Sequence, residues 1–580
     1  MQENGIAAYI TFSTDPHAGE YVPAHWESRK WVTGFTGSAG TAVVTFNDGG
    51  LWTDSRYFLQ AEEQLKGSGL KLFKERLPET PSICEWLGGN IPEGSKIGFD
   101  GYTTPISIVA DMRSQLSKYG LELVMTDDPY IYIWSDRPAI ADDKPFILEE
   151  RFTGQGTKSK IEQIRNEVSA GSNDAIIISS LDDIAWTLNM RGKDIHCNPL
   201  FISYLVIFKE SATIYINSNK LSEEIIEYLH SHNISIKEYE EIESDLKSFA
   251  DYNILMPPSI NYALFEAASD KNNIKIVESP VTRLKSVKNS TEIAGFREAM
   301  KRDGIAMVRF LIWLKKSVHE EDITEFSLDK KLYEYRSAMK HFSGISFDTI
   351  AGYQEHGAIV HYEATEESAL HLKPEGLLLL DSGAQYLDGT TDITRTIPLG
   401  ATSEKQKKDY TLVLKGFIQL AMAEFPDGTC GTQLDVLARI AMWRCGINYG
   451  HGTGHGVGHF LNVHEGPHQI RMNHIPTILK PGMTITNEPG IYRSGEYGIR
   501  TENTMLIVPS QETEFGKFYK FEQLTLCPID KEPIITEMLS DEEISWLNGY
   551  HQKVYDTLSP ELNQEEKLWL KDMTLPINNK

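Results

Sequence analysis

The sequence has little cysteine and no long apolar run. Its 580 residues include five cysteines without a Cys-x-x-Cys pair, namely Cys84, Cys197, Cys430, Cys445 and Cys527. An odd number without paired spacing predicts free thiols in a reducing compartment and argues against a disulfide-rich secreted fold. The apolar run at 377–380 is far below the ~20 residues of a membrane-spanning helix. Since no signal-peptide pattern opens the chain either, we expect a cytoplasmic protein.

Positive charge is also scarce. Lysine and arginine together number 56 against 82 aspartate and glutamate residues, which gives a formal net charge of −26. This excess of negative charge argues against nucleic acids and anionic membrane surfaces as partners. A chain of this length is too long for one hydrophobic core, so several domains are expected.

Strand-like and helix-like segments alternate through the first half of the chain. Residues 7–12 read as a strand, and 41–54 as a hairpin that turns at 47–50. A polar, proline-containing stretch at 136–145 reads as a linker, and the same alternation then resumes. We therefore predict two N-terminal α/β domains of similar build and a third, longer domain, with the bounds 1–136, 137–285 and 286–580.

Three helices are predicted in the third part from apolar residues at helical spacing. The first has Ser290 or Thr291 as its N-cap. The second opens with a capping box formed by Ser403 and Gln406, and the third stops at Gly446. Between the helices the period changes to two, which predicts strands that direct their polar side chains into one pocket.

Stretch 376–508 contains a candidate metal site of four carboxylates and one imidazole: Asp381, Asp392, His455, Glu488 and Glu502. Each acidic residue taken singly is more often solvated or capping a turn. Together, carboxylates gathered without a cation would raise one another's pKa and destabilise the fold. An oxygen-rich, thiolate-free set suits manganese, cobalt(II) or a similar ion, and four carboxylates suit two metals that share bridging ligands.

Histidines supply the other candidates. His451, His455 and His459 follow one another at intervals of four, but the intervening glycines argue against a regular helix. We assign His455 as the metal ligand, expect His451 to face substrate and interpret His459 as structural. His361 and His464 are the remaining candidates for the pocket, although a single histidine is more often packed than catalytic.

The motifs AIVHYEA, DSGAQYLDGTTDITRT, HGTGHGVGHFLNVHEGP, NEPGIY and GIRTEN closely resemble aminopeptidase P, the Xaa-Pro aminopeptidases of the pita-bread metallopeptidase fold. Further stretches, among them WVTGFTGSAGTAVVT, LDDIAWTLNMRG and FEQLTLCPID, resemble the long three-domain cytosolic form, so the resemblance covers essentially the entire chain. It implies an α/β (α+β) architecture with a C-terminal pita-bread catalytic domain, and a homodimer held mainly by the C-terminal part, residues 510–580.

The resemblance also implies roles for individual residues. Two divalent metals, usually manganese and alternatively cobalt or zinc, would be held by the five candidate ligands. Three histidines would contact the substrate: His361, His451 and His464. Arg500 would fix Glu502 from behind the site, and Glu20 would reach toward the amino end of the substrate. One departure is His459, where the family often has a small polar residue.

The implied activity is release of the N-terminal residue from peptides that have proline in the second position. A hydroxide between the two metals would attack the carbonyl before proline, with Glu488 as general base and proton carrier. A prolidase, which cuts only Xaa-Pro dipeptides, is the alternative enzyme, although its usual form has a single N-terminal domain. A non-catalytic pita-bread binding protein is disfavoured because all five ligands are present.

Overall fold

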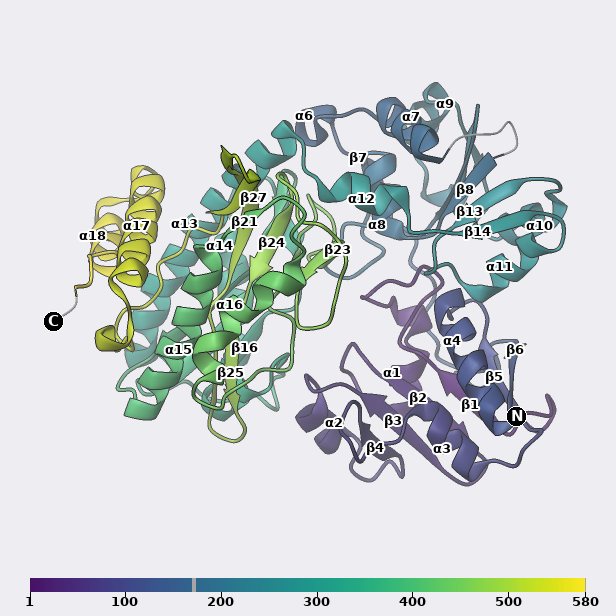
Figure 1. Cartoon of the computed structure of the whole chain (residues 1–580), viewed down its shortest axis with the longest axis horizontal. Coiled ribbons are helices and arrows are strands. Elements are labelled where there is room, and N and C mark those ends of the chain that lie inside the picture. The colour runs from purple at the N-terminus through teal and green to yellow at the C-terminus, as the bar shows by residue number, and fades with distance from the viewer. Residues whose placement is uncertain (169–173, 579–580) are drawn as a thin grey trace. The chain divides into compact units, whose positions relative to one another are not determined.

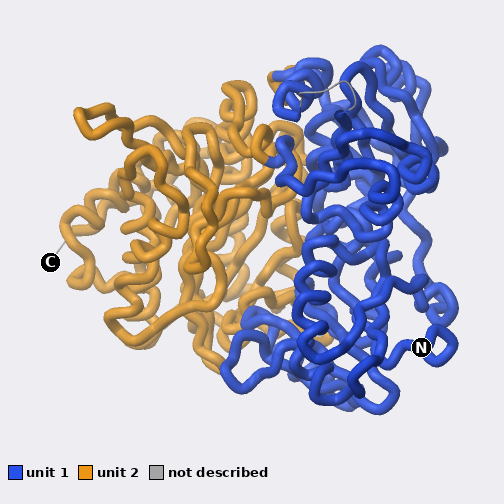
Figure 2. Tube along the Cα trace, turned by 45° about the vertical axis from the view of Figure 1, so that its right-hand side comes forward, with its two compact units in different colours: residues 1–149, 155–282 blue, residues 150–154, 283–580 orange. Residues whose placement is uncertain are grey.

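The structure is a computed structural model that describes residues 1–168 and 174–578 (Figure 1). The chain divides into two compact units, shown in different colours in Figure 2. Unit 1 comprises 1–149 and 155–282, and unit 2 comprises 150–154 and 283–580. The finer domain boundaries at 136 and 285 stay predictions. Among the helices of the described residues, none is both long enough and apolar enough to span a membrane.

The first sheet of unit 1 has six strands in the order β4-β3-β2-β1-β5-β6. The predicted hairpin is present, since β2 and β3 pair antiparallel, and β1 pairs antiparallel with β2. The three remaining pairs, β3 with β4, β1 with β5 and β5 with β6, are parallel. The strands are β1 Ala8–Thr11, β2 Thr41–Thr45, β3 Gly49–Thr53, β4 Lys71–Lys74, β5 Lys96–Asp100 and β6 Glu122–Thr126.

The second sheet of unit 1 repeats this topology in the order β12-β11-β10-β8-β13-β14. Its central pairs, β8 with β10 and β10 with β11, are antiparallel, and the outer pairs are parallel. The matching order and directions confirm the predicted similar build. The strands are β8 Asp174–Ile178, β10 Tyr204–Phe208, β11 Ala212–Tyr215, β12 Ile234–Lys237, β13 Asn253–Met256 and β14 Asn273–Ile276.

Helices connect and cover both sheets of unit 1. One hydrophobic cluster contains Phe99 of the first sheet together with Ile177 and Tyr204 of the second, so both sheets share a core and form one unit. The main helices are α1 Ser28–Thr33, α2 Phe58–Gln64, α3 Ile83–Asn90, α4 Ile106–Leu116, α7 Thr157–Val168, α8 Leu181–Thr187, α9 Glu223–Ser231, α10 Glu241–Ser248 and α11 Tyr262–Ser269.

Unit 2 contains a six-stranded sheet in the order β21-β28-β27-β24-β22-β23 and a three-stranded sheet in the order β16-β17-β20. The strands of the six-stranded sheet are β21 Glu424–Pro426, β22 Gly454–Gly456, β23 Glu465–Ile470, β24 Thr484–Asn487, β27 Asn503–Thr513 and β28 Gly516–Gln523. Those of the smaller sheets are β15 Phe342–Ile345, β16 Ile350–Tyr353, β17 Leu377–Ser382, β18 Ala384–Tyr386, β19 Gly389–Thr390, β20 Ile393–Pro398, β25 Gly490–Arg493 and β26 Tyr497–Arg500.

Helices pack against these sheets through their apolar faces (Figure 1). Leu420 of α15 and Leu434 of α16 join the core of the six-stranded sheet, and Phe310 of α13 joins that of the β16-β17-β20 sheet. The helices are α13 Ser290–Glu320, α14 Glu325–Ser337, α15 Glu404–Ala421, α16 Gly431–Trp443, α17 Asp541–Leu558 and α18 Gln564–Met573.

Helix ends agree with the sequence pattern except at one cap. The box formed by Ser403 and Gln406 is present. The N-cap of α13, however, is Asn289 and not Ser290 or Thr291, so that prediction was wrong. Asn289 accepts from the two N–H groups of Thr291 and Glu292, and asparagine caps helices as well as serine does. The regular part of α16 ends at Trp443, and Gly446 follows with a φ of +71°.

Candidate metal centre

The five predicted ligands lie in strands of unit 2 or directly beside them. Asp381 lies in β17, and Asp392 immediately precedes β20, which pairs antiparallel with β17 so that Asp381 faces Thr394. His455 lies in the middle of β22, Glu488 follows β24 and Glu502 immediately precedes β27. The centre therefore combines residues of the β16-β17-β20 sheet with residues of the six-stranded sheet.

Their side-chain atoms gather in one place. The ligand atoms of Asp392, His455 and Glu502 all lie within 4.8 Å of one another. The Nε2 atom of His455 is 3.4 Å from Asp392 Oδ2 and 3.6 Å from Glu488 Oε1. Asp381 belongs to the same electrostatic group, because the Asp392 carboxylate raises the pKa of Asp381. The structure thus brings all five side chains together, while their role as ligands stays a prediction.

The imidazole of His455 is held in one orientation. Its Nδ1 atom is 2.9 Å from the carbonyl oxygen of Gly456, so Nδ1 is the nitrogen that donates. In the neutral ring, Nε2 then presents its lone pair toward the oxygens of Asp392 and Glu488. A lone pair facing carboxylates is unfavourable by itself and becomes favourable when a cation lies between them.

Burial makes the charged forms of these acids costly. It raises the pKa of Asp381, and the neighbouring Asp392 carboxylate raises that pKa further against the opposing effect of Arg500. Burial, with Asp392 and Asp381 adding to it, raises the pKa of Glu488 to about 7. Burial and the same two aspartates raise the pKa of Glu502 well above its usual range. The site therefore favours protons or a cation over free carboxylates.

Arg500 binds Asp381 directly and is linked to Glu502 through a threonine. Its Nη2 and Nε atoms donate to Asp381 Oδ2 over 2.7 and 3.2 Å. Glu502 instead accepts from the Thr394 hydroxyl at 2.7 Å, and Thr394 in turn accepts from Arg500 Nε at 3.1 Å. The β17–β20 register places Thr394 beside Asp381. Arg500 therefore reaches Glu502 through Thr394, and its role of fixing Glu502 from behind the site stays a prediction.

His451 lies beside the acidic group and is tied to it by a tyrosine. Its Nε2 atom is 2.7 Å from the hydroxyl of Tyr492, which also accepts from Arg500 Nη1 at 2.7 Å. Its Nδ1 atom lies 3.9 Å from Glu488 Oε2. Sequence reasoning did not single out Tyr492, although it stands in the NEPGIY motif. Tyr492 stands two residues after Gly490, on the hairpin that leads to Arg500, and this position could have indicated that it lies near the acidic group.

The three remaining predicted histidines lie in different surroundings. The ring of His464 packs edge-on against His455, with 4.2 Å between the ring centres. His361 follows Val360, whose carbonyl lies 3.5 Å from Arg500 Nη2, so the chain at His361 adjoins the acidic group. His459 is buried with its ring 5.5 Å from that of Phe296 in α13.

Glu20 belongs to unit 1, whereas the five predicted ligands belong to unit 2. It is an exposed residue of unit 1. Burial lowers the pKa of the Arg56 side chain in this unit, whereas Asp54 and, more weakly, Glu20 raise it. Its expected role toward the substrate stays a prediction.

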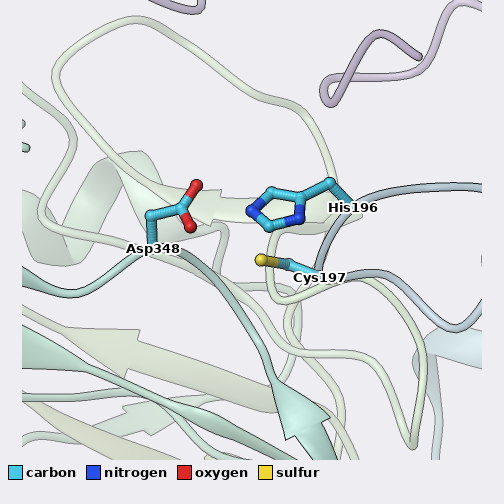
Figure 3. A group of neighbouring side chains, drawn as sticks. All are labelled: His196, Cys197 and Asp348. Carbon is cyan, nitrogen blue, oxygen red and sulfur yellow. The ribbon is translucent and has the colours of Figure 1, made fainter. Parts of the chain in front are cut away.

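Three further residues with metal-binding side chains are drawn in Figure 3. His196 and Cys197 belong to unit 1, in the connection before β10, whereas Asp348 belongs to unit 2, between β15 and β16. The three do not form a cluster within either unit, and no metal site is inferred from them.

Family models match nearly the whole chain. The metallopeptidase family M24 model matches residues 294–509, and its C-terminal region matches 517–577. Two models of the creatinase/prolidase N-terminal domain match residues 1–129 and 136–292. Full-length relatives agree. An Xaa-Pro aminopeptidase 1 of Dictyostelium discoideum is 37% identical over 100% of this chain and 95% of the relative, and the Xaa-Pro aminopeptidase ApepP of Drosophila melanogaster is 40% identical over 99% and 96%.

The chain belongs to the Xaa-Pro aminopeptidases of metallopeptidase family M24.

Two solved structures resemble this chain over all or part of its length. An X-prolyl aminopeptidase from Caenorhabditis elegans, described as a cytosolic enzyme with a di-nuclear active site, superimposes with a TM-score of 0.95 at 36% identity. The match covers 99% of this chain and 95% of that one. An Xaa-Pro dipeptidase from Bacillus anthracis shares the fold over 65% of this chain, with a TM-score of 0.52 at 24% identity. The M24 pita-bread fold and two preceding creatinase-type domains are thereby confirmed.

Proposed function

We propose that this chain is a metal-dependent aminopeptidase that releases the N-terminal residue from peptides with proline in the second position. One observation carries the proposal: four carboxylates and an imidazole converge in a chain that is similar to Xaa-Pro aminopeptidases over its entire length. The family assignment makes it a metallopeptidase and disfavours the reading as a non-catalytic binding protein. The prolidase reading is disfavoured because the similarity to aminopeptidases includes both N-terminal domains.

The residues present fit a pair of divalent cations. One oxygen of Asp381 is buried without a hydrogen-bond partner, which is costly unless a cation takes its lone pairs. Three of the four carboxylates have raised pKa values, mainly through burial, and the Nε2 lone pair of His455 faces two of the acids. We propose that two metals are held here by Asp381, Asp392, His455, Glu488 and Glu502. The donor set favours manganese, with cobalt and zinc as the alternatives.

When bound, two such metals polarise a carbonyl and lower the pKa of an attacking water. The chain's own residues then move protons and orient the peptide. Glu488, one of the five proposed ligands, is also the proposed base that takes the proton of the water. The same carboxylate would then return a proton to the proline nitrogen, which cannot leave unprotonated. Arg500 holds Asp381 and, through Thr394, Glu502 in place for this chemistry.

The imidazoles are proposed to bind the peptide around the scissile bond. His361 or His464 would donate to the carbonyl oxygen as charge develops on it. His451, held by Tyr492, would contact the proline side. Glu20 of unit 1 is proposed to pair with the free amino group of the substrate. Recognition of that amino group would limit the enzyme to one residue per cut.

The experiment is peptide cleavage followed by mass spectrometry. The protein loaded with manganese is incubated with Arg-Pro-Pro, Gly-Pro and a control peptide, Arg-Ala-Pro. Release of arginine from Arg-Pro-Pro but not from Arg-Ala-Pro supports the proposal. Cleavage of Gly-Pro with Arg-Pro-Pro left intact establishes the prolidase alternative. The variant Glu488→Gln is the matched control, because it keeps the size of the side chain and lacks the proposed base.

We further propose a cytoplasmic homodimer. The cytoplasmic location rests on the cysteine pattern and on the C. elegans relative, which is described as cytosolic. The dimer rests on the family resemblance of residues 510–580, most of which the M24 C-terminal model matches. Sedimentation at micromolar concentration tests the oligomeric state, and a monomeric mass would contradict it.

A further inference from the structure

Glu325 is a buried carboxylate of unit 2 outside the candidate metal centre. It is the first residue of α14 and is 0% exposed. Its backbone N–H donates to the carbonyl of Leu370 at 3.1 Å. A fully buried carboxylate is stable only when its lone pairs are hydrogen-bonded, so the partners of Glu325 show what it holds.

Among the described residues, the hydrogen-bond partners of this carboxylate lie in one segment, residues 353–370, which we call the His361 segment. Oε1 accepts from the backbone N–H of Tyr353 at 2.7 Å, and Oε2 accepts from that of Leu370 at 2.7 Å. Oε2 also accepts from the hydroxyl of Tyr362 at 3.1 Å. The Nδ1 atom of His356 lies 2.9 Å from Oε2 and 3.1 Å from Oε1. One carboxylate therefore bonds the segment at both ends and twice in between.

His361 stands between two residues that are themselves held. Val360 before it accepts from Arg500 through its carbonyl, at 3.5 Å. Tyr362 after it donates to Glu325 and packs in a small hydrophobic cluster with Tyr492, the residue that contacts His451. The segment is thus tied on one side to the arginine that binds the acidic group and on the other side to Glu325.

We propose that Glu325 is a positioning residue for the peptidase reaction: it holds the His361 segment in the conformation in which His361 meets the substrate. The inference rests on the proposed function and deepens it. A carboxylate suits this task because it accepts several hydrogen bonds at once, and charged acceptors bind more strongly than neutral ones. A glutamine in its place would turn an N–H group toward groups that can only donate, such as the backbone amides of Tyr353 and Leu370.

The first test measures order in the segment without using activity. In Glu325→Gln, amide hydrogen exchange of Tyr353 and Leu370 should become at least ~10-fold faster, because both N–H groups lose a charged acceptor. The matched control is Glu543→Gln. Glu543 is also 0% exposed and lies in the first turn of a helix, where it accepts from Lys415 at 2.7 Å and Gln419 at 2.8 Å. The control should leave exchange in the His361 segment unchanged.

The second test is a double-mutant cycle on the manganese-loaded enzyme with Arg-Pro-Pro. Glu325→Gln should lower kcat/KM by ~10- to 100-fold, the range typical of residues that orient a functional side chain. In the His361→Ala background the same change should lower it by less than about twofold, because the residue that Glu325 positions is gone. Losses that multiply in the double variant would overturn the proposal, since they would mean that Glu325 acts independently of His361.

A milder variant keeps the test decisive if Glu325→Gln does not fold. Tyr362→Phe removes only the hydroxyl that donates to Glu325, and the cycle with His361→Ala is then run with this variant, with the same expected non-additivity. Failure of the proposed function is seen separately, as a wild type that does not cleave Arg-Pro-Pro. The exchange measurement still stands in that case, and unchanged exchange at Tyr353 and Leu370 would overturn the positioning role.

Discussion

Removing metal from the centre should make the stability of unit 2 depend on pH in a direction opposite to ordinary acid denaturation. Burial, with Asp392 and Asp381 adding to it, raises the pKa of Glu488 from 4.5 to about 7 in the metal-free protein. Because the folded pKa is the higher one, the folded state keeps a proton between pH 4.5 and 7 that the unfolded state has lost. Stability is then greatest below the unfolded pKa and falls as pH rises through about 7.

The expected magnitude follows from the size of the shift. At about 1.4 kcal/mol for each pH unit, the full effect of Glu488 is about 3 kcal/mol, and about 2 kcal/mol of it falls between pH 5.5 and 8. The shifts of Asp381 and Glu502 have the same sign and add to it. A bound cation stabilises the ionised carboxylates and so removes the penalty, and manganese at pH 8 should restore the lost stability.

The assay is urea denaturation of the chelated protein at several pH values. The unfolding transition to follow is the one whose midpoint shifts when manganese is added. Glu488→Gln is the matched variant, since it cannot ionise and should lose most of the pH-dependent decline. Its chelated form should therefore be more stable than chelated wild type at pH 8, and the difference should shrink toward pH 5.5. Equal slopes for the two proteins would refute the reasoning, because the decline would then come from other groups.

Four further outcomes are expected. Asp392→Asn or Glu502→Gln should abolish turnover with an unchanged circular dichroism spectrum, because each replaces a charged ligand by a neutral one; near-normal turnover with both metals bound would show that the assignment is wrong. His361→Ala should lower turnover by ~10²–10³-fold with metal content and melting temperature unchanged, if it stabilises the oxyanion; loss of a metal would remove it from the substrate-binding set. Glu465→Gln should lower the free energy of unfolding by ~3–5 kcal/mol, because the buried lysines Lys285 and Lys288 lose the carboxylate that they share. A loss below about 1 kcal/mol would contradict this. Sedimentation should give a dimer at micromolar concentration, and a monomeric mass would contradict this.

Local pattern was enough for much of the fold. The hairpin between β2 and β3, the capping box at Ser403 and the repeated α/β build follow from turn residues, caps and periodicity, which act over a few residues. The cap of α13 was missed because Asn289 and Ser290 are equally good caps, and the choice depends on which one places Glu292 at the third helical position.

The sequence by itself determined the chemistry that this chain can perform. It supplies four acids and one histidine at the ends of strand-like segments, in an arrangement that resembles one peptidase family over the whole length. These properties are readable because ligand type and strand period are local. Only the tertiary structure decided which groups pair. Arg500 binds Asp381, 119 residues away in the chain, and Glu325 holds a segment up to 45 residues away. Such pairs depend on strand register and on burial, which one-dimensional spacing does not contain.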